Sequence, residues 1–156
     1  MVSAMNQVRL FTIGFTQRSA KDFFTTLKQH DVQKIIDVRL NNTSQMAGFT
    51  KRRDLCYFLE NLCDCKYVHR ITWAPTQDIL DAYRGKAITW NKYKTVFLDI
   101  LYKRQIETET NVDDLNYSCL LCSEYDANAC HRRLVAEYLQ TKFSNFKIVL
   151  SLFIKP

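Results

Sequence analysis

Three consecutive basic side chains, His131, Arg132 and Arg133, follow a cysteine and precede an apolar stripe that predicts a helix. The first turn of a helix carries partial positive charge and normally collects acidic residues. Three basic residues at this point are therefore unfavourable unless an anion compensates them. Glu124 and Asp126, just upstream, are internal candidates for that role. A ligand phosphate or carboxylate, held by free backbone N–H groups, is the functional alternative.

The cysteine before these residues, Cys130, adds a reactive group at the same point of the chain. A thiol at a helix N-terminus beside histidine and arginine is expected to have a lowered pKa and to be able to act as a nucleophile. The alternative is a buried thiol that packs as a small apolar side chain. No CxxxxxR phosphate loop follows Cys130, so a mechanism of the tyrosine-phosphatase type is not predicted.

A carboxylate and a guanidinium group stand close together earlier in the chain. Asp37 and Arg39 are two residues apart in a predicted strand, so their side chains share one face. The carboxylate can orient a base or hold the guanidinium group in a fixed position. An ion pair that closes the end of the strand is the alternative interpretation.

The cysteines also raise the question of a metal site. Cys119 and Cys122 form a CxxC pair, and together with Cys130 and His131 they resemble a set of zinc ligands. The CxxC pair lies within an apolar run that predicts a strand, where positions three apart point to opposite faces. The two cysteines therefore cannot reach one metal ion without breaking the strand. We expect neither a metal ion nor a cofactor.

The apolar residues follow two periodicities in turn, which predicts strands that alternate with helices. Runs rich in β-branched and aromatic residues predict strands at residues 8–14, 34–39, 66–70, 117–123 and 146–153. Helical spacing predicts helices that begin near Ser19, Thr50, Pro75, Thr89 and His131, and the polar segment 107–116 predicts a loop. Such alternation implies βαβ units. We expect a single three-layer α/β domain over residues 1–156, with a mostly parallel sheet of about five strands and helices on both faces.

Ligands of such sheets bind beyond the carboxyl ends of the strands, so the residues at those ends are the candidate site. We expect Arg39 and Arg132 to bind an anionic group, with Thr16 and Arg18 as further substrate-binding residues. Glu124 or His131 would transfer a proton, because their surroundings could bring a pKa near the working pH. Asp37 would orient a partner, and Cys130 would be a nucleophile or a packed thiol.

Composition limits the class of protein. The chain has 156 residues, 47% hydrophobic and 24% charged, with a formal net charge of +6, as in a soluble globular protein that favours anionic partners. The two common nucleotide-binding fingerprints, GxGxxG and GxxxxGK[ST], are absent. No signal peptide or apolar run of membrane-spanning length is visible, so we expect a cytoplasmic protein without a membrane partner. Its six cysteines are then thiols rather than disulfides.

Several short motifs resemble those of one family. These are Thr12-Ile13-Gly14-Phe15-Thr16, Asp37-Val38-Arg39, Gly48-Phe49, and Cys122-Ser123-Glu124 followed by Cys130-His131-Arg132. They stand in the order seen in the domain-of-unknown-function 488 family, and the resemblance extends from about residue 10 to residue 150. Many members have histidine where this chain has Phe15, which argues against a base at that position. The resemblance implies an intracellular α/β domain and directs attention to these segments; it implies no substrate.

Three functions remain open at this point. The first is an enzyme, a hydrolase or transferase, that acts on a phosphorylated or otherwise anionic substrate such as a nucleotide or a nucleic-acid end. The second is a non-catalytic, basic nucleic-acid-binding module, which requires a continuous basic surface. The third is a redox protein that works through Cys130, which requires an accessible thiol of low pKa. The sequence does not distinguish among oligomeric states.

Overall fold

Five strands form one sheet in which each strand runs parallel to its neighbours. The computed structural model describes residues 6–43, 48–124 and 127–152. The strands are β1 (Gln7–Gly14), β2 (Lys34–Asp37), β3 (Lys66–His69), β4 (Ser118–Cys122) and β5 (Lys147–Leu152). Their order across the sheet is β3-β2-β4-β1-β5, with every pairing parallel. All five carboxyl ends therefore lie at one edge, and the expected parallel sheet is confirmed.

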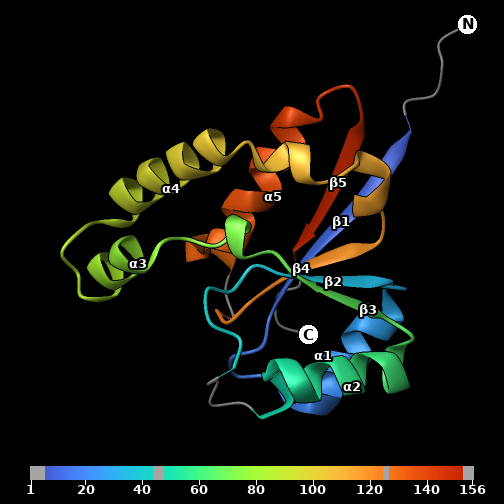
Figure 1. The fold of residues 1–156 in the computed structure, drawn as a ribbon. Coiled ribbons are helices and arrows are strands. Elements are labelled where there is room, and N and C mark those ends of the chain that lie inside the picture. Colours follow the sequence, from blue (N-terminus) through green and yellow to red (C-terminus); the bar gives the residue numbers. More distant parts are fainter. Residues whose placement is uncertain (1–5, 44–47, 125–126, 153–156) are drawn as a thin grey trace, which may run out of the picture.

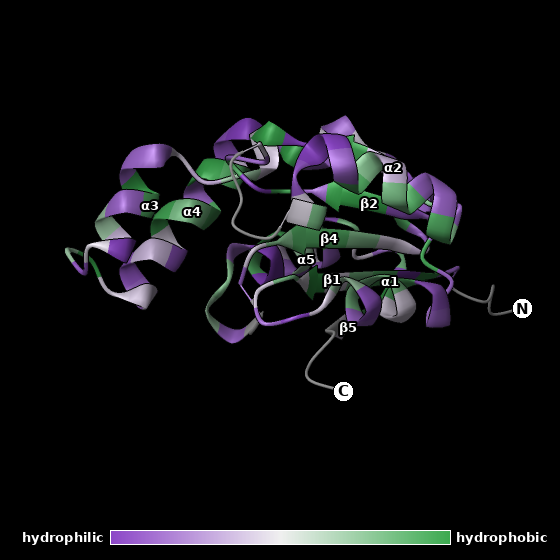
Figure 2. Cartoon of the chain, turned by 90° about the horizontal axis from the view of Figure 1, so that it is seen from below, coloured by the Kyte–Doolittle hydropathy of each residue, from purple (hydrophilic) through white to green (hydrophobic). Residues whose placement is uncertain are grey.

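Helices cover both faces of this sheet, as Figure 1 shows. On one face lie α1 (Ala20–Gln29) and α2 (Arg52–Cys63), and on the other lie α4 (Trp90–Arg104) and α5 (His131–Lys142). The short helix α3 (Gln77–Arg84) packs against α4. Both views show α3 and α4 extending together away from the sheet (Figures 1 and 2). The expected three-layer α/β architecture is confirmed.

Two helices begin at the capping residues that the sequence predicts. The side-chain oxygen of Ser19 accepts a hydrogen bond from the backbone N–H of Asp22 at 3.0 Å. The side-chain oxygen of Thr89 accepts one from the backbone N–H of Lys92 at 3.2 Å. Each bond satisfies one of the backbone donors that a helix leaves free at its start. Among the described residues, none of the helices is long and apolar enough to cross a membrane.

Several predicted boundaries differ from the structure. The strand predicted at 34–39 ends at Asp37, so Arg39 follows β2 instead of lying in it. Pro75 precedes α3 instead of opening it, because Thr76 takes the extended N-cap conformation. The segment 107–116, predicted as a loop, contains 3-10 turns at Ile106–Glu109 and Val112–Leu115. The apolar residues of these turns are buried, so a few hydrophobic contacts order a segment whose composition is mostly polar.

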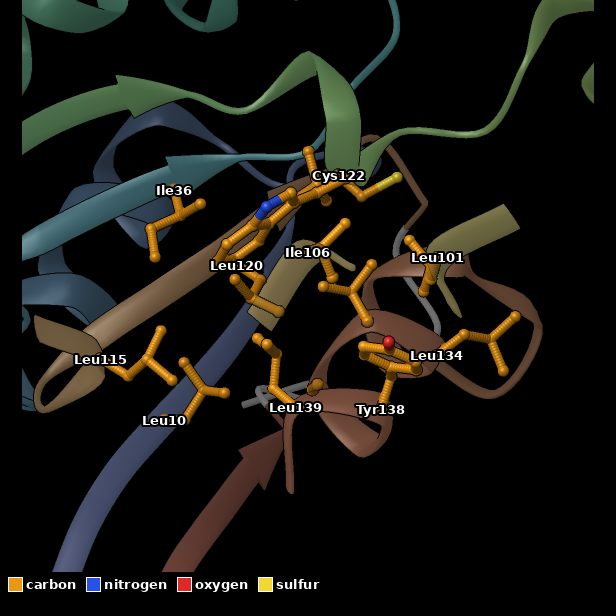
Figure 3. Close-up of a cluster of buried hydrophobic side chains, with 14 of the residues drawn as sticks. Leu10, Ile36, Leu101, Ile106, Leu115, Leu120, Cys122, Leu134, Tyr138 and Leu139 are labelled. Carbon is orange, nitrogen blue, oxygen red and sulfur yellow. The ribbon is translucent and has the colours of Figure 1, made fainter. Parts of the chain in front are cut away.

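Each face of the sheet carries its own hydrophobic core, and β4 contributes to both. Its five residues are all buried, as predicted for a strand covered on both sides. Cys119 packs in the core under α1 and α2, whereas Cys122 packs in the core under α4 and α5. Figure 3 shows part of the second core, with Leu115 and Cys122 towards opposite ends. The two cysteines of the CxxC pair therefore face opposite sides of the sheet, as predicted.

Candidate functional site

Two adjoining pockets lie at the carboxyl edge of the sheet. The first, which we call the arginine pocket, measures about 280 Å³ and is lined by the segment after β2, by α3, and by Ser123 and His131. The second, which we call the cysteine pocket, measures about 180 Å³ and lies between α3, the start of α4, the end of β4 and the start of α5. Both pockets include Leu80, Arg84, Ser123 and His131 in their walls. They are therefore two parts of one depression.

Asp37 and Arg39 form a buried ion pair beside the arginine pocket. Arg39 donates hydrogen bonds from Nε and Nη2 to the two carboxylate oxygens of Asp37, at 2.9 and 2.8 Å. The hydroxyl of Tyr67 donates to the same carboxylate at 2.6 Å, and Nη2 of Arg39 also donates to the carbonyl oxygen of Thr50 at 2.8 Å. Asp37 thus holds the guanidinium group in a fixed position, one of the two roles considered for it.

One guanidinium nitrogen of Arg39 is not used by this network. Its Nη1 atom is buried and has no hydrogen-bond partner among the described residues. The ring of Phe15 lies against the guanidinium group, 5.4 Å from ring centroid to Cζ, which is a cation–π contact. Arg39 also contributes to the wall of the arginine pocket. Asp37 therefore balances the charge of Arg39 but leaves one of its donors uncommitted.

Arg132 lies inside the protein and not in a pocket wall. Its side chain is fully buried; Nε donates to the hydroxyl of Thr12 at 3.3 Å, and Nη1 donates to the carbonyl oxygen of Glu124. Gly14 makes room for this contact, because a Cβ atom there would overlap that carbonyl group and lie 2.9 Å from Nη1 of Arg132. We therefore assign Arg132 to holding the segment after β4, and not to the anion-binding role predicted for it.

The basic start of α5 is compensated within the chain. Arg132 is met by the Glu124 carbonyl oxygen, and Arg133 donates to the Glu137 carboxylate at 2.8 Å, one turn further along the helix. The side chain of Glu124, predicted as a compensating acid, is exposed at the edge of the cysteine pocket. Asp126, the other candidate, lies outside the described residues. The crowding of positive charge thus does not by itself require a ligand.

Thr16 and Arg18, predicted to bind substrate, lie in the loop after β1 and bond to other parts of the protein. The hydroxyl of Thr16 donates to the carbonyl oxygen of Ser123, and its backbone N–H donates to the same oxygen at 3.0 Å. Arg18 pairs with Asp22 at 2.7 Å. Neither Thr16 nor Arg18 is among the described residues that line the two pockets. The contacts of Thr16 join the ends of β1 and β4, and the ion pair of Arg18 joins the loop to α1.

The cysteine pocket contains two thiols and an imidazole. The Sγ atom of Cys122 lies 3.4 Å from Nδ1 of His131, and the ligand atoms of Cys122, Cys130 and His131 all lie within 4.8 Å of one another. Nε2 of His131 lies 2.8 Å from the carbonyl oxygen of Val38. Because a carbonyl oxygen only accepts hydrogen bonds, Nε2 carries a proton in both charge states of the ring; Nδ1 accepts from Cys122 when the ring is neutral and donates to the Cys122 thiolate when the ring is protonated.

The two thiols differ in acidity. Burial raises the pKa of Cys122, but the hydrogen bond from Cys130 and the positive charges of His131 and Arg132 outweigh burial, so the pKa is held well below that of a free thiol. Burial and the hydrogen bond to Cys122 raise the pKa of Cys130 well above that value. Burial lowers the pKa of His131, but the Cys122 thiolate outweighs this effect and raises it. The thiol of lowered pKa is therefore Cys122. Cys130, for which the sequence predicted a lowered pKa, has a raised one and is buried, in keeping with the alternative of a packed thiol.

Aromatic rings form the wall of the cysteine pocket opposite the thiols. Tyr83, Trp90 and Tyr93 pack on one another, with ring centroids 5.0 to 5.6 Å apart. Tyr83 and Trp90 are half-buried and also contact the core under α4 and α5. Their remaining surface faces a pocket that contains Arg84.

The sequence predicted a site at the edge of the sheet where the two pockets lie, but three residues that line these pockets, Arg84, Cys122 and Trp90, were not among the predicted site residues. Arg84 is the last residue of α3, whereas the predicted site residues were chosen at the ends of strands. Cys122 was considered only with Cys119, although it is the last residue of β4 and therefore lies at the predicted edge. The Cys122-Ser123-Glu124 motif itself was the signal that could have placed Cys122 beside the Cys130-His131 pair.

The fold and the site define an α/β protein with a parallel five-stranded sheet and a polar depression at its carboxyl edge. A family model described as "Domain of unknown function DUF488" matches residues 19–139, and the chain belongs to this family. The match includes Asp37, Arg39, Arg84, Cys122 and His131. Neither the comparison with curated proteins nor the comparison with solved structures found a match.

Proposed function

We propose that the protein is an enzyme that acts on a phosphorylated or otherwise anionic substrate, a nucleotide or the end of a nucleic acid. The observation that carries the proposal is the composition of the arginine pocket. Arg39, Arg84 and His131 line it, and the described residues of its wall include no Asp or Glu. A concave site with guanidinium donors and no carboxylate in its wall favours a phosphate or a carboxylate.

The neighbouring cysteine pocket supports the nucleotide class of substrate. Tyr83 and Trp90 contribute ring faces to its wall, and Arg84 belongs to both pockets. Aromatic faces stack on bases of any sequence, and such stacking contributes about 1–3 kcal/mol per base. A phosphate near Arg84 and a base against the aromatic wall would therefore occupy adjacent parts of one depression.

The proposed chemistry is hydrolysis or group transfer at the anionic group. In hydrolysis, water attacks the phosphorus atom and loses a proton, while the bond to the ester oxygen breaks and that oxygen gains a proton. Glu124 is the best-placed side chain for this proton transfer, since it is exposed and lines the cysteine pocket. His131 is a weaker candidate, because its Nε2 is already committed to the carbonyl oxygen of Val38.

We also propose a cytoplasmic location. All six cysteines are free in the structure, and thiols persist in reducing compartments.

Ligand-dependent thermal stability tests the binding part of the proposal. We expect AMP, pyrophosphate and a 5′-phosphorylated oligonucleotide to raise the melting temperature, because each binds only the folded state. Arg84→Gln is expected to weaken binding by about tenfold, since it removes a charge-assisted donor. Arg9→Gln is the matched control, because it makes the same charge change at an exposed position near the amino end of β1.

Three outcomes decide between the alternatives. Release of inorganic phosphate or of a new product, lost in Glu124→Gln, supports an enzyme. Binding of oligonucleotides that falls steeply with salt and that Arg9→Gln and Arg84→Gln weaken equally supports the nucleic-acid-binding module instead. The proposal fails if none of the three anions changes the melting temperature of the protein.

A further inference from the structure

The three ligand atoms of Cys122, Cys130 and His131 form the most compact group of metal-ligating side chains in the described part of the chain. They come from the end of β4 and the start of α5, all three residues are buried, and the atoms lie within 4.8 Å of one another. We propose that Cys122, Cys130 and His131 bind one zinc ion through two thiolates and Nδ1. This inference does not depend on the anion-binding function proposed above.

The separations are close to those of a tetrahedral zinc site. With Zn–S near 2.3 Å and Zn–N near 2.05 Å, two ligands of one tetrahedral ion lie about 3.5 Å apart if one is nitrogen and about 3.8 Å apart if both are sulfur. The observed distance between Cys122 Sγ and His131 Nδ1 is 3.4 Å. The remaining pairs are within 4.8 Å, so no pair has to approach by more than about 1.3 Å.

The surroundings of His131 prepare it as a ligand. Metal-bound histidines usually donate their other ring N–H to a carbonyl oxygen or a carboxylate, which fixes the ring and its tautomer. Nε2 of His131 makes this bond with Val38 at 2.8 Å, which leaves Nδ1 as the ligand atom. Sγ of Cys122 lies 3.4 Å from Nδ1 and 3.6 Å from Nε2, so the ring has to turn for Nδ1 and this sulfur to bind one ion. The loop before α5 brings Cys130 to the same point, because this residue is the N-cap and has an extended backbone.

The charge of the two thiolates and the open side of the site towards the cysteine pocket also favour zinc. Two thiolates neutralise a zinc ion, so the occupied site carries no net charge in a place where Cys122 is 2% and Cys130 is 1% exposed. A site with three protein ligands keeps one position for water or substrate, which is the pattern of catalytic zinc. That position would face the cysteine pocket, whose wall includes all three ligands together with Ser123 and Glu124.

The strand geometry that prevents Cys119 and Cys122 from binding one ion does not affect this ligand set. The CxxC pair cannot bind one ion, because Cys119 and Cys122 face opposite cores. In this ligand set Cys130 takes the place of Cys119. Cys130 lies at the start of α5, on the same side of the sheet as Cys122. The set thus has the spacing Cys122, Cys130, His131, and its two segments are joined by the short connection between β4 and α5.

Metal content and a cobalt spectrum test the proposal on the whole chain. The protein is stripped with a chelator under reducing conditions, reloaded with Zn²⁺ or Co²⁺, and desalted. We expect one ion per chain by mass spectrometry, and a thiolate-to-cobalt charge-transfer band of the intensity of two thiolates. Cys122→Ser and Cys130→Ser should each lose the retained ion, and His131→Asn should weaken binding at least about tenfold.

Cys119→Ser is the matched control, since it alters a buried thiol of the same strand on the other face, and half-buried Cys63→Ser is a second control if Cys119→Ser fails to fold. Both controls should retain one ion. The proposal is overturned if the folded wild type retains no ion, if Cys122→Ser retains as much as wild type, or if the metal-free protein forms a Cys122–Cys130 disulfide and cobalt produces no charge-transfer band after reduction. Pyrophosphate binding is measured on the same samples, so loss of metal and loss of anion binding are separate results.

Discussion

Gly14, the last residue of β1, lies in direct contact with the carbonyl group of Glu124, the second residue after β4. A Cβ atom at position 14 would overlap this carbonyl group and would also crowd the guanidinium group of Arg132. The backbone of Gly14 has no positive φ, so this position requires glycine for space and not for conformation. The contact brings the ends of β1 and β4 together beside the cysteine pocket.

Replacement of Gly14 by alanine should therefore destabilise the fold. The neighbouring atom belongs to the backbone and cannot move aside as a side chain would, so we expect a loss of about 3 kcal/mol or more in the free energy of unfolding. Urea denaturation measures this loss. Gly48→Ala is the control, because a Cβ atom there meets nothing within 4 Å, and it should change stability by no more than about 0.5 kcal/mol. Equal effects of the two substitutions would contradict the packing argument.

The buried Asp37–Arg39 pair should be far more sensitive than a surface pair. Asp37→Asn leaves a buried guanidinium group without its counter-charge, so we expect a loss of about 3–5 kcal/mol. The comparison is Asp99→Asn, whose partner Lys103 lies 2.7 Å away on the exposed side of α4 and whose loss should cost less than about 1 kcal/mol. Chemical denaturation of both variants measures the difference. A loss for Asp37→Asn no larger than that for Asp99→Asn would show that the pair does not hold the end of β2.

The capping bond of α4 should contribute about 1 kcal/mol. Thr89→Ala removes the oxygen that accepts from the backbone N–H of Lys92, and thermal or urea unfolding reports the loss. Thr95→Ala is a matched control inside the same helix, where the hydroxyl donates to the carbonyl oxygen of Asn91 and caps nothing. Thr95→Ala should leave stability nearly unchanged or raise it. A cap effect no larger than this control would contradict the assignment.

Stability should fall at alkaline pH, and Cys65 should account for part of the fall. Burial raises the pKa of Cys65 from 9.0 to about 12. Below about pH 9 both the folded and the unfolded chain keep this proton; above it, the unfolded chain loses the proton first, so the unfolded state gains stability until the pH reaches the folded pKa. Cys65→Ala removes this contribution.

Between pH 7.5 and about pH 10.5, wild type should therefore lose about 2 kcal/mol more than Cys65→Ala. Urea denaturation under reducing conditions at the two pH values measures this difference. Between pH 6 and pH 7.5 the gap between the two proteins should stay constant, which serves as the internal control. Parallel stability curves up to pH 10.5 would show that the thiol ionises as freely in the folded chain as in the unfolded one.

The elements of the fold were predictable because their signals are local. The Ser19 and Thr89 caps, the continuous apolar run of β4 and the alternation of strand and helix each depend on residues that are near one another in the sequence. The 3-10 turns of 106–115 were missed, because their buried apolar residues pack in a core built from distant elements, β1 among them, and leave no periodic pattern in a polar segment.

The sequence alone determined the family resemblance, the strand–helix order and the edge of the sheet at which polar and reactive residues meet. Only the tertiary structure decided the partners of those residues: Arg132 donates to the hydroxyl of Thr12 and to the carbonyl oxygen of Glu124, Arg84 comes from α3, and the thiol of lowered pKa is Cys122 and not Cys130. The physical reason is that periodicity and capping act over a few residues. Desolvation and charge pairing instead depend on which distant segments pack together, as the contact between Val38 and His131, 93 positions apart in the sequence, illustrates.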